Sequence, residues 1–401
     1  MVSTLLVVGI LVAVFVGFNI GGSSTGVAFG PAVGSNTMGK LSAAVLMTTF
    51  ALLGGWTVGR EVIKTMGGEI VPQTEFTLAV SVAILFFVGM ALLVSNLFGV
   101  PASTSMTAVG AIAGLGVATG TIRWEVMGRI VTWWLVAPIL AFWVCAVIGR
   151  YLYPYLEAWF ALDRTEGDMF DFDRSGAVPI PRLADSTTYR EVIGATLVVA
   201  IGCYMAFSAG ASNVANAIAP LYANEALAMT EGILLASGAI GLGAFTIARR
   251  TLDTVGNDLT ELPILAALIV EVVSASLITF LSANGIPASL AVSATMCVVG
   301  LGWGRATRTT RLSDAAGAAV SGEGDPDLSV DALAKDGGDD TKEPAEPGDV
   351  ARIGEEDPDQ ISAVDLFDPA ATGRVVVLWI LTPSISAVAS YAVFQFTTLA
   401  V

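Results

Sequence analysis

The sequence predicts an all-α polytopic membrane protein, built from two inverted-topology repeats of about five transmembrane helices, each with a re-entrant hairpin. Three observations predict this class. First, the chain of 401 residues is 54% hydrophobic and only 13% charged, whereas a soluble globular chain carries about 25% charged residues. Second, several apolar runs reach the roughly 20 residues that span a bilayer. Third, the two halves of the chain resemble each other.

Ten apolar runs are predicted to form transmembrane helices, because each is long and nearly free of charged residues. The first run is expected to stay in the membrane, since it has neither a basic n-region nor a clear small-residue cleavage site. The ten runs cover residues 2–18, 40–58, 76–98, 102–120, 127–152, 191–208, 226–247, 262–282, 287–303 and 374–399.

These runs divide the chain into five parts. In chain order they are a first repeat at residues 1–155, a polar connector at 156–190, four spans of the second repeat at 191–304, a loop at 305–373 and the last helix at 374–401. Between Asp314 and Asp368 the loop contains 17 acidic and three basic residues, which account for most of the net charge of −16. This charge, with many glycines and prolines, predicts a disordered loop.

Two polar, glycine-rich stretches indicate an internal duplication. The stretch "GGSSTGVAFGPAVGS" begins at Gly21 and the stretch "GASNVANAIAPLYA" begins at Gly210, so a shift of 189 residues aligns them. The same shift pairs Gly54 with Gly243. An odd number of spans in each copy inserts the second copy upside down. That arrangement is typical of secondary transporters, which bind substrate near the membrane midplane between the two halves.

The basic residues near the span ends predict the orientation in the cell membrane. One side has only Arg60, Lys64, Arg123 and Arg129. The other side has Arg150, Arg164, Arg174, Arg182, Arg190, Arg249, Arg250, Arg305, Arg308, Arg311 and Arg374. The richer side should be cytoplasmic, so the acidic loop is expected in the cytoplasm and both termini outside.

Segments 20–36 and 209–224 are too polar and too rich in glycine for ordinary spanning helices. Non-helical backbone survives at membrane depth only where it is buried in protein or lines a cavity, so each segment is predicted to be a re-entrant hairpin. A half-helix that begins inside the membrane aims its N–H groups at the cavity, which favours an anion. The side chains expected to contact that anion are Ser23, Ser24 and Thr25 in the first copy and Ser212, Asn213 and Asn216 in the second.

A second repeated element supplies further hydroxyl groups. "PASTSM" begins at Pro101 and "PASLAV" begins at Pro287, each at the start of a span. Proline is favoured in the first helical turn, and a following Ser or Thr caps the helix or faces a ligand. The residues expected at the site are Ser103, Thr104, Ser105 and Ser289. Four helix starts from two inverted halves would form a neutral cage for an oxyanion.

Catalytic and metal-binding constellations are not expected. The chain has no histidine, and its three cysteines lie singly within apolar runs, so no enzyme, metal site or cofactor is predicted. Glu271 lies well inside the apolar run 262–282. An intramembrane carboxylate is costly and is by default a functional candidate; here a role in proton or cation coupling and a structural hydrogen bond have equal weight.

The duplicated motifs resemble the PiT family of inorganic phosphate transporters, which carries two copies of a "GANDVANA…GP" signature. The best matching pieces are "GASNVANAIAPL" at residues 210–221, "GPAVGS" at 30–35 and "ARRTLDTVGNDLTEL" at 248–262. The resemblance implies a homodimeric carrier, driven by a sodium or proton gradient, that holds phosphate between the paired hairpins. Asn19, just before the first polar segment, joins Glu271 as a candidate for the coupling ion.

Several positions depart from the family's pattern. Ser23-Ser24 and Ser212-Asn213 replace its Asn-Asp pairs, so both hairpin carboxylates are missing. Apolar residues replace an Asn, two Thr and two His: Val27, Leu290, Ala291, Met106 and Val292. The predicted site is therefore less negative than the family's pattern.

The predicted function is secondary transport of inorganic phosphate across the cytoplasmic membrane by alternating access, with no nucleic-acid partner. One alternative keeps the fold and changes the cargo to sulfate or another tetrahedral oxyanion. Another alternative is a transport-dead membrane sensor that uses the acidic loop as a tether.

Overall fold

The computed structural model describes residues 4–35, 37–97, 103–160, 170–173, 180–183, 189–247, 263–309 and 369–397. Each of the ten predicted apolar runs overlaps one helix, and two of these helices continue well past the predicted ends. These are α1 (Thr4–Gly34), α2 (Lys40–Thr57), α4 (Leu78–Leu97), α5 (Thr104–Thr119), α6 (Trp124–Val147), α8 (Tyr189–Ala223), α9 (Met229–Thr246), α11 (Ile264–Ala283), α12 (Leu290–Ala306) and α14 (Pro369–Phe396). The predicted all-α polytopic class is confirmed at this level.

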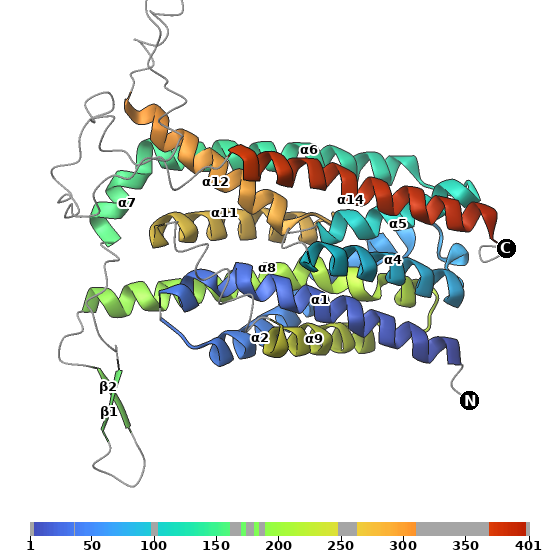
Figure 1. Cartoon of the computed structure of the whole chain (residues 1–401), viewed down its shortest axis with the longest axis horizontal. Helices are drawn as coiled ribbons and strands as arrows, with labels where there is room; N and C mark the ends of the chain where they lie inside the picture. The colour runs from blue at the N-terminus through green and yellow to red at the C-terminus, as the bar shows by residue number, and fades with distance from the viewer. Residues whose placement is uncertain are drawn as a thin grey trace, which may run out of the picture.

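The helices lie side by side in one bundle (Figure 1). The start of α1 and the end of α14 lie at one end of the bundle, whereas α7 (Tyr153–Phe160) lies at the other. Near that second end lie two short antiparallel strands, β1 (Phe170–Asp173) and β2 (Ile180–Leu183). They fall in the connector, for which no strand was predicted. Most of the acidic loop lies outside the described residues.

In the part of the chain that the structure describes, fewer helices are long enough to span a membrane than the ten that the sequence predicts. Within the described residues, six helices are long and apolar enough to cross a membrane, or seven if α2 and the bent segment after it count as one span. Helix α5 has 16 residues, about 24 Å at 1.5 Å per residue, which is shorter than the roughly 30 Å hydrocarbon core. The apolar part of α4 and helix α12 are also short.

The two polar segments are not hairpins but continue two long helices. Helix α1 runs through residues 20–34, and α8 runs through residues 209–223. The helix satisfies its own backbone groups, and hydroxyl groups bond to the preceding turn: Thr25 Oγ1 donates to the Gly21 carbonyl at 2.6 Å. Glycine and serine in these segments therefore do not require a break in the helix.

The chain instead turns back between α4 and α5 and between α11 and α12. The backbone N–H of Arg123, after α5, donates to the carbonyl of Ile70, before α4, at 2.9 Å, so this pair enters and leaves at the same end of the bundle. Helices α11 and α12 form the matching pair in the other half of the bundle's length (Figure 1). Their turn contains Gly285 in the left-handed region, with φ of 68°.

Close helix crossings explain the duplicated glycines. Helix α1 packs against α9, and a Cβ added at Gly21 would lie 1.9 Å from the Ile240 carbonyl oxygen. At the same crossing, a Cβ at Gly243 would lie 2.0 Å from the Phe18 carbonyl oxygen. Real Cβ atoms do not approach oxygen so closely, so both helices need glycine here.

Helices α2 and α8 form the equivalent crossing. A Cβ at Gly54 would lie 1.9 Å from the Phe207 carbonyl oxygen, and one at Gly210 would lie 2.1 Å from that of Ala51. These four residues are the aligned counterparts of the four at the α1–α9 crossing. Helix α5 likewise packs against α14, and α6 packs against α12.

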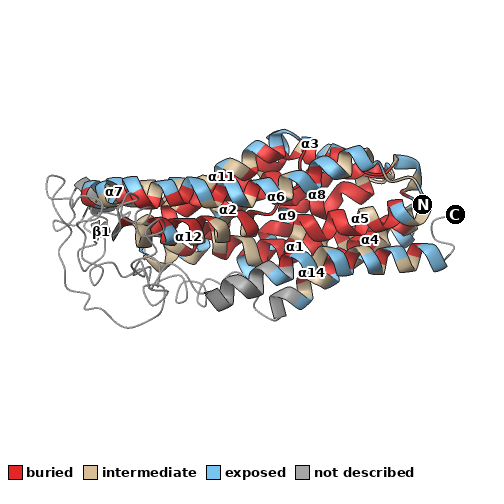
Figure 2. Cartoon of the chain, turned by 90° about the horizontal axis from the view of Figure 1, so that it is seen from above, coloured by how far each residue is buried: buried red, intermediate tan, exposed pale blue. Residues whose placement is uncertain are grey.

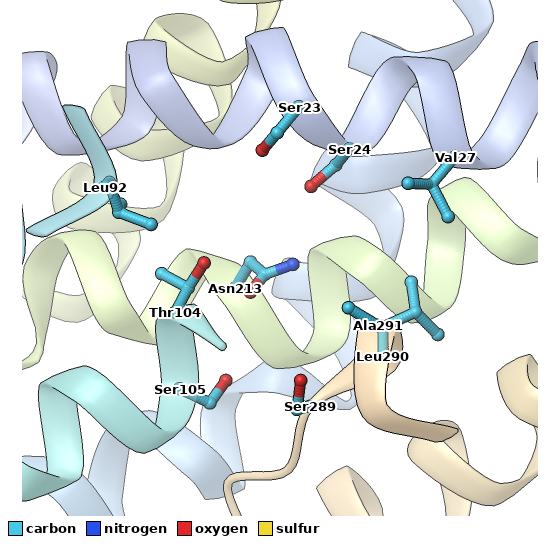
Figure 3. Close-up of a pocket in the computed structure, with 10 residues that line it drawn as sticks. All are labelled: Ser23, Ser24, Val27, Leu92, Thr104, Ser105, Asn213, Ser289, Leu290 and Ala291. Atoms are coloured by element: carbon cyan, nitrogen blue, oxygen red, sulfur yellow. The ribbon is translucent and has the colours of Figure 1, made fainter. Parts of the chain in front are cut away.

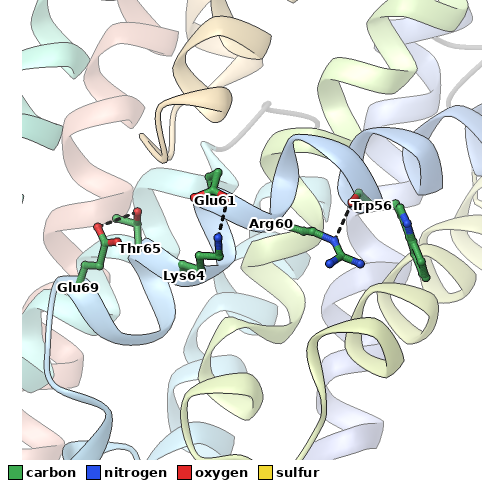
Figure 4. A network of polar contacts seen from close by, with 6 residues as sticks. All are labelled: Trp56, Arg60, Glu61, Lys64, Thr65 and Glu69. Atoms are coloured by element: carbon green, nitrogen blue, oxygen red, sulfur yellow. Dashed lines mark hydrogen bonds and ion pairs between the residues drawn. The ribbon is translucent and has the colours of Figure 1, made fainter.

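After α2 the chain bends by 63° into α3 (Gly59–Lys64) and a π-helical turn, η1 (Thr65–Glu69). Figure 4 shows its polar contacts, which include a 2.7 Å ion pair between Lys64 and Glu61 and a 3.1 Å hydrogen bond from Thr65 to Glu69. A Cβ at Gly285 would lie 2.7 Å from Thr65 Oγ1. The bent segment therefore packs against the turn that leads into α12.

The outer faces of the helices carry large apolar side chains, whereas buried residues line the inward faces (Figure 2). On α6, Leu135, Ile139 and Trp143 recur every four residues and are more than half exposed, so they form one stripe. On α14, Ile385 and Val388 are exposed at 63% and 67%. Extended exposed apolar surface marks contact with lipid or with a partner protein.

Alanine at Gly243 should force α1 and α9 apart, because the new methyl group would overlap the Phe18 carbonyl oxygen. Overpacking of this kind costs about 1–3 kcal/mol, so Gly243→Ala should lower the melting temperature of the purified protein in detergent. Gly238→Ala on the same helix meets open space and should not destabilise the protein, since alanine is the better helix former. Equal melting temperatures for the two variants would contradict the close crossing.

Candidate oxyanion-binding site

A cavity of about 60 Å³ lies where the two helical pairs meet the middle of α1 and α8 (Figure 3). It is lined by Ser23, Ser24 and Val27 of α1, Leu92 of α4, Thr104 and Ser105 of α5, Asn213 of α8, and Ser289, Leu290 and Ala291 at the start of α12. One water occupies about 10–15 Å³ of such space. The cavity therefore has room for a few waters or one small tetrahedral ion.

Two helices begin at this cavity. Ser103 caps α5 by accepting a hydrogen bond from the Met106 N–H at 3.3 Å, and Ser289 caps α12 by accepting from the Val292 N–H at 3.3 Å. The first N–H groups of a helix have no partner within it, and the helix dipole is positive at this end. Both features favour an anion in the cavity between them.

A buried network of hydrogen bonds fixes one side of the cavity. The Asn216 amide donates to Ser105 Oγ at 3.0 Å and to Asn213 Oδ1 at 3.1 Å. Ser212 Oγ donates to the Ala288 carbonyl at 2.7 Å and lies 3.1 Å from Ser105 Oγ. Because Ser212 has one hydroxyl hydrogen, Ser105 must be the donor in that contact. The network therefore ties α8 to α5 and to the turn before α12.

Four other polar groups keep hydrogens for a ligand. Among the described residues, the hydroxyls of Ser24, Thr104 and Ser289 and the amide of Asn213 donate to no protein group, although all four line the cavity. The lining contains no charged side chain. No group of three potential metal ligands occurs in the part of the chain that the structure describes. The arrangement is a neutral cage of hydrogen-bond donors.

The structure brings six of the ten predicted substrate residues to the cavity: Ser23, Ser24, Thr104, Ser105, Asn213 and Ser289. The other four lie around it, with Ser212 and Asn216 in the buried network, Ser103 as the helix cap and Thr25 bonded to its own helix. Their proximity is compatible with the predicted site, but their role in binding stays a prediction.

The two candidates for ion coupling do not line the cavity. The Asn19 amide donates to the Phe15 carbonyl of its own helix at 2.8 Å. Glu271 is 4% exposed on α11, and among the described residues no group donates a hydrogen bond to its Oε1 atom. Such a buried oxygen is costly to leave without a partner, and the coupling role of both residues stays a prediction.

The sequence did not point to the four apolar lining residues as part of a site. Val27, Leu290 and Ala291 were noted only as departures from a family pattern, whereas Leu92 lies in an apolar run with no distinguishing signal. Arg249 and Arg250, considered as residues at the cytoplasmic side, lie outside the described residues.

Comparison with known proteins supports the fold and the function predicted from the motifs. A family model described as the phosphate transporter family matches residues 20–390. A solved structure, titled "The sodium-dependent phosphate transporter", shares the fold with a TM-score of 0.66 and 17% sequence identity, over 98% of each chain. Both halves of this chain are therefore covered by the comparison.

Two curated relatives have different cargoes in their names. The sulfate permease CysP of Bacillus subtilis is 30% identical over 294 residues, which cover 73% of this chain and 76% of the permease. A putative phosphate permease of Chlamydia muridarum is 27% identical over 390 residues, which cover 77% of this chain and 92% of that protein. The match over residues 20–390 supports phosphate transport and shows that this chain belongs to the phosphate transporter family.

Proposed function

We propose that this membrane protein is a secondary transporter that moves inorganic phosphate across the cytoplasmic membrane by alternating access. One observation carries the proposal: an uncharged cavity at which two helix starts and two long helices present unused hydrogen-bond donors. Such donors replace the water that an oxyanion loses when it enters the protein. Membership of the phosphate transporter family supports the same function.

We further propose that the two halves are inverted repeats and that the α4–α5 and α11–α12 pairs are re-entrant. The matched crossings α1–α9 and α8–α2, and the matched contacts α5–α14 and α12–α6, support a two-fold relation between the halves. If each half has three spanning helices and one re-entrant pair, the number of crossings is odd and the halves have opposite orientation. Rocking of one half against the other would then expose the cavity to each side in turn.

Ion coupling is proposed because the cargo is negative. At a potential of 100 mV, inside negative, moving one negative charge inward costs about 2.3 kcal/mol, and the cavity has no cationic side chain to offset it. Co-transported sodium ions or protons would compensate this charge. Glu271 is the proposed site for the coupling ion, with Asn19 as the second candidate.

The proposed orientation places the acidic loop in the cytoplasm and both termini outside, following the distribution of basic residues. The exposed apolar stripes on α6 and α14 would contact lipid or, in a homodimer, the second copy. The homodimer itself is implied by the family resemblance and stays a proposal.

Sulfate is a second candidate cargo. A sulfate permease is 30% identical to this chain, and no carboxylate lines the cavity. A carboxylate would accept the hydrogen that phosphate keeps near neutral pH, whereas sulfate has no hydrogen to donate. A neutral cage of donors therefore suits sulfate at least as well as phosphate.

If phosphate is the main cargo, unlabelled phosphate should inhibit the uptake of labelled phosphate into proteoliposomes at a lower concentration than sulfate does. The reverse order, together with uptake of labelled sulfate, would assign sulfate instead. Absence of saturable flux for both ions, with binding retained, would favour the transport-dead sensor and overturn the transporter proposal.

Ser105→Ala should reduce uptake about tenfold or more, because it removes the hydroxyl that links Asn216 to Ser212. A hydrogen bond contributes about 0.5–1.5 kcal/mol, and stranding a buried partner adds to the loss. The matched control is Ser384→Ala on α14, where the exposed serine bonds only to its own helix. Wild-type uptake by Ser105→Ala at equal reconstituted protein would contradict the placement of the site.

Glu271→Gln tests coupling separately from binding. The glutamine keeps the size of the side chain but not its charge, so gradient-driven accumulation of labelled phosphate should be lost, while exchange of internal for external phosphate continues. Sodium and pH gradients are imposed in separate experiments to identify the coupling ion. Glu125→Gln, at the exposed start of α6, is the control. Normal accumulation by Glu271→Gln would exclude this carboxylate from coupling.

A further inference from the structure

Three apolar residues gather at one end of the candidate cavity. Figure 3 shows Val27, Leu290 and Ala291 at that end, the single apolar residue Leu92 at the opposite end, and the serine and threonine hydroxyls and Asn213 between them. Leu290 is 8% exposed and therefore fixed in position by its neighbours. Only part of the cavity wall can donate hydrogen bonds from side chains.

The apolar end results from differences between the two halves of the chain. Each of the three apolar residues at this end has a polar counterpart in the other half when the repeated motifs are aligned. The aligned pairs are Val27 with Asn216, Leu290 with Thr104 and Ala291 with Ser105. The polar members lie in the cavity lining or in its hydrogen-bond network. A symmetric cage for four equivalent oxygens is therefore not what this chain builds.

An ion with four equivalent oxygens would place one oxygen against this apolar end. That oxygen would lose its water and find no side-chain donor, with only the backbone N–H groups at the start of α12 nearby, so it would be less well hydrogen-bonded than the other three oxygens. An ion with three oxygens and one substituent that does not need hydrogen bonds would avoid this loss. Its three oxygens would face Ser24, Thr104, Ser289 and Asn213, and its fourth substituent would contact Val27 and Leu290.

We propose that this site selects tetrahedral oxyanions with three oxygens and one weakly hydrogen-bonding substituent, and that Val27, Leu290 and Ala291 determine this selectivity. Thiosulfate, in which sulfur replaces one oxygen of sulfate, and methylphosphonate, in which a methyl group replaces one oxygen of phosphate, represent the class. The inference rests on the proposed function only in its use of this cavity as the anion site.

The test compares each analogue with its parent ion on the full-length protein. Thiosulfate and sulfate have the same charge near neutral pH, so their ratio reports the fourth substituent alone. Thiosulfate should inhibit labelled oxyanion uptake at several-fold lower concentration than sulfate, as expected when one apolar contact discriminates by about tenfold. Methylphosphonate should likewise compete better than phosphate. The inference would be overturned if sulfate and phosphate inhibited uptake at the same concentration as thiosulfate and methylphosphonate, or at a lower one.

Calorimetric titration of the detergent-purified protein with the same four ions separates this inference from the transport proposal. Tighter binding of thiosulfate than of sulfate supports the selectivity even if neither ion crosses the membrane, an outcome that would refute only transport. Binding of the parents with equal or higher affinity refutes the selectivity even if uptake is normal.

Leu290→Thr introduces threonine at the apolar end, which is the residue type of the aligned position in the first half, Thr104. The hydroxyl should reverse the preference, lowering the ratio of sulfate to thiosulfate inhibition constants by about tenfold. Because the ratio is measured on one preparation, a loss of folded protein does not change it. Leu242→Thr on α9, where leucine is 57% exposed, is the matched control and should keep the wild-type ratio. An unchanged ratio in Leu290→Thr would overturn the assignment.

Discussion

Every backbone polar group at membrane depth needs a partner, and this constraint accounts for the architecture of the site. The long helices α1 and α8 satisfy their backbone groups internally, even through their polar segments. Helices α5 and α12 instead begin inside the bundle, at Thr104 and Leu290. Their first N–H groups remain available, and these residues line the cavity. Unpaired backbone is thus tolerated where it faces a space that an anion can fill.

The sequence predicted the presence of ten helices because apolar runs of low charge have few alternatives in a bilayer, but it predicted neither the ends of α1 and α8 nor how many helices are long enough to span. The prediction of hairpins at residues 20–36 and 209–224 was wrong because glycine and serine were interpreted as signs of irregular backbone. In the structure, Gly21 and Gly210 serve close contact between helices, at which a Cβ would lie within 1.9–2.1 Å of a carbonyl oxygen. A contact between residues far apart in sequence leaves no local signal that distinguishes it from a turn.

The sequence predicted most of the polar residues of the candidate site, but not the backbone structure that brings them together. Hydroxyl and amide residues in the repeated motifs lie together although the predicted hairpins are absent, because the motifs lie where α1 and α8 pass the starts of α5 and α12. The apolar members of the lining could not be selected in advance, because an apolar residue in an apolar run carries no information on what it faces. Leu92 illustrates this, since only its place in the cavity lining identifies it.

The two halves of the chain have kept different features for different physical reasons. At the helix crossings both copies retain glycine, as in Gly54 and Gly243, because any side chain there collides with backbone that cannot move independently. At the cavity the copies differ, as in Thr104 and Leu290, because a side chain that faces a space of about 60 Å³ can change without displacing a helix. Packing therefore constrains the residues at the helix crossings more tightly than those that line the cavity.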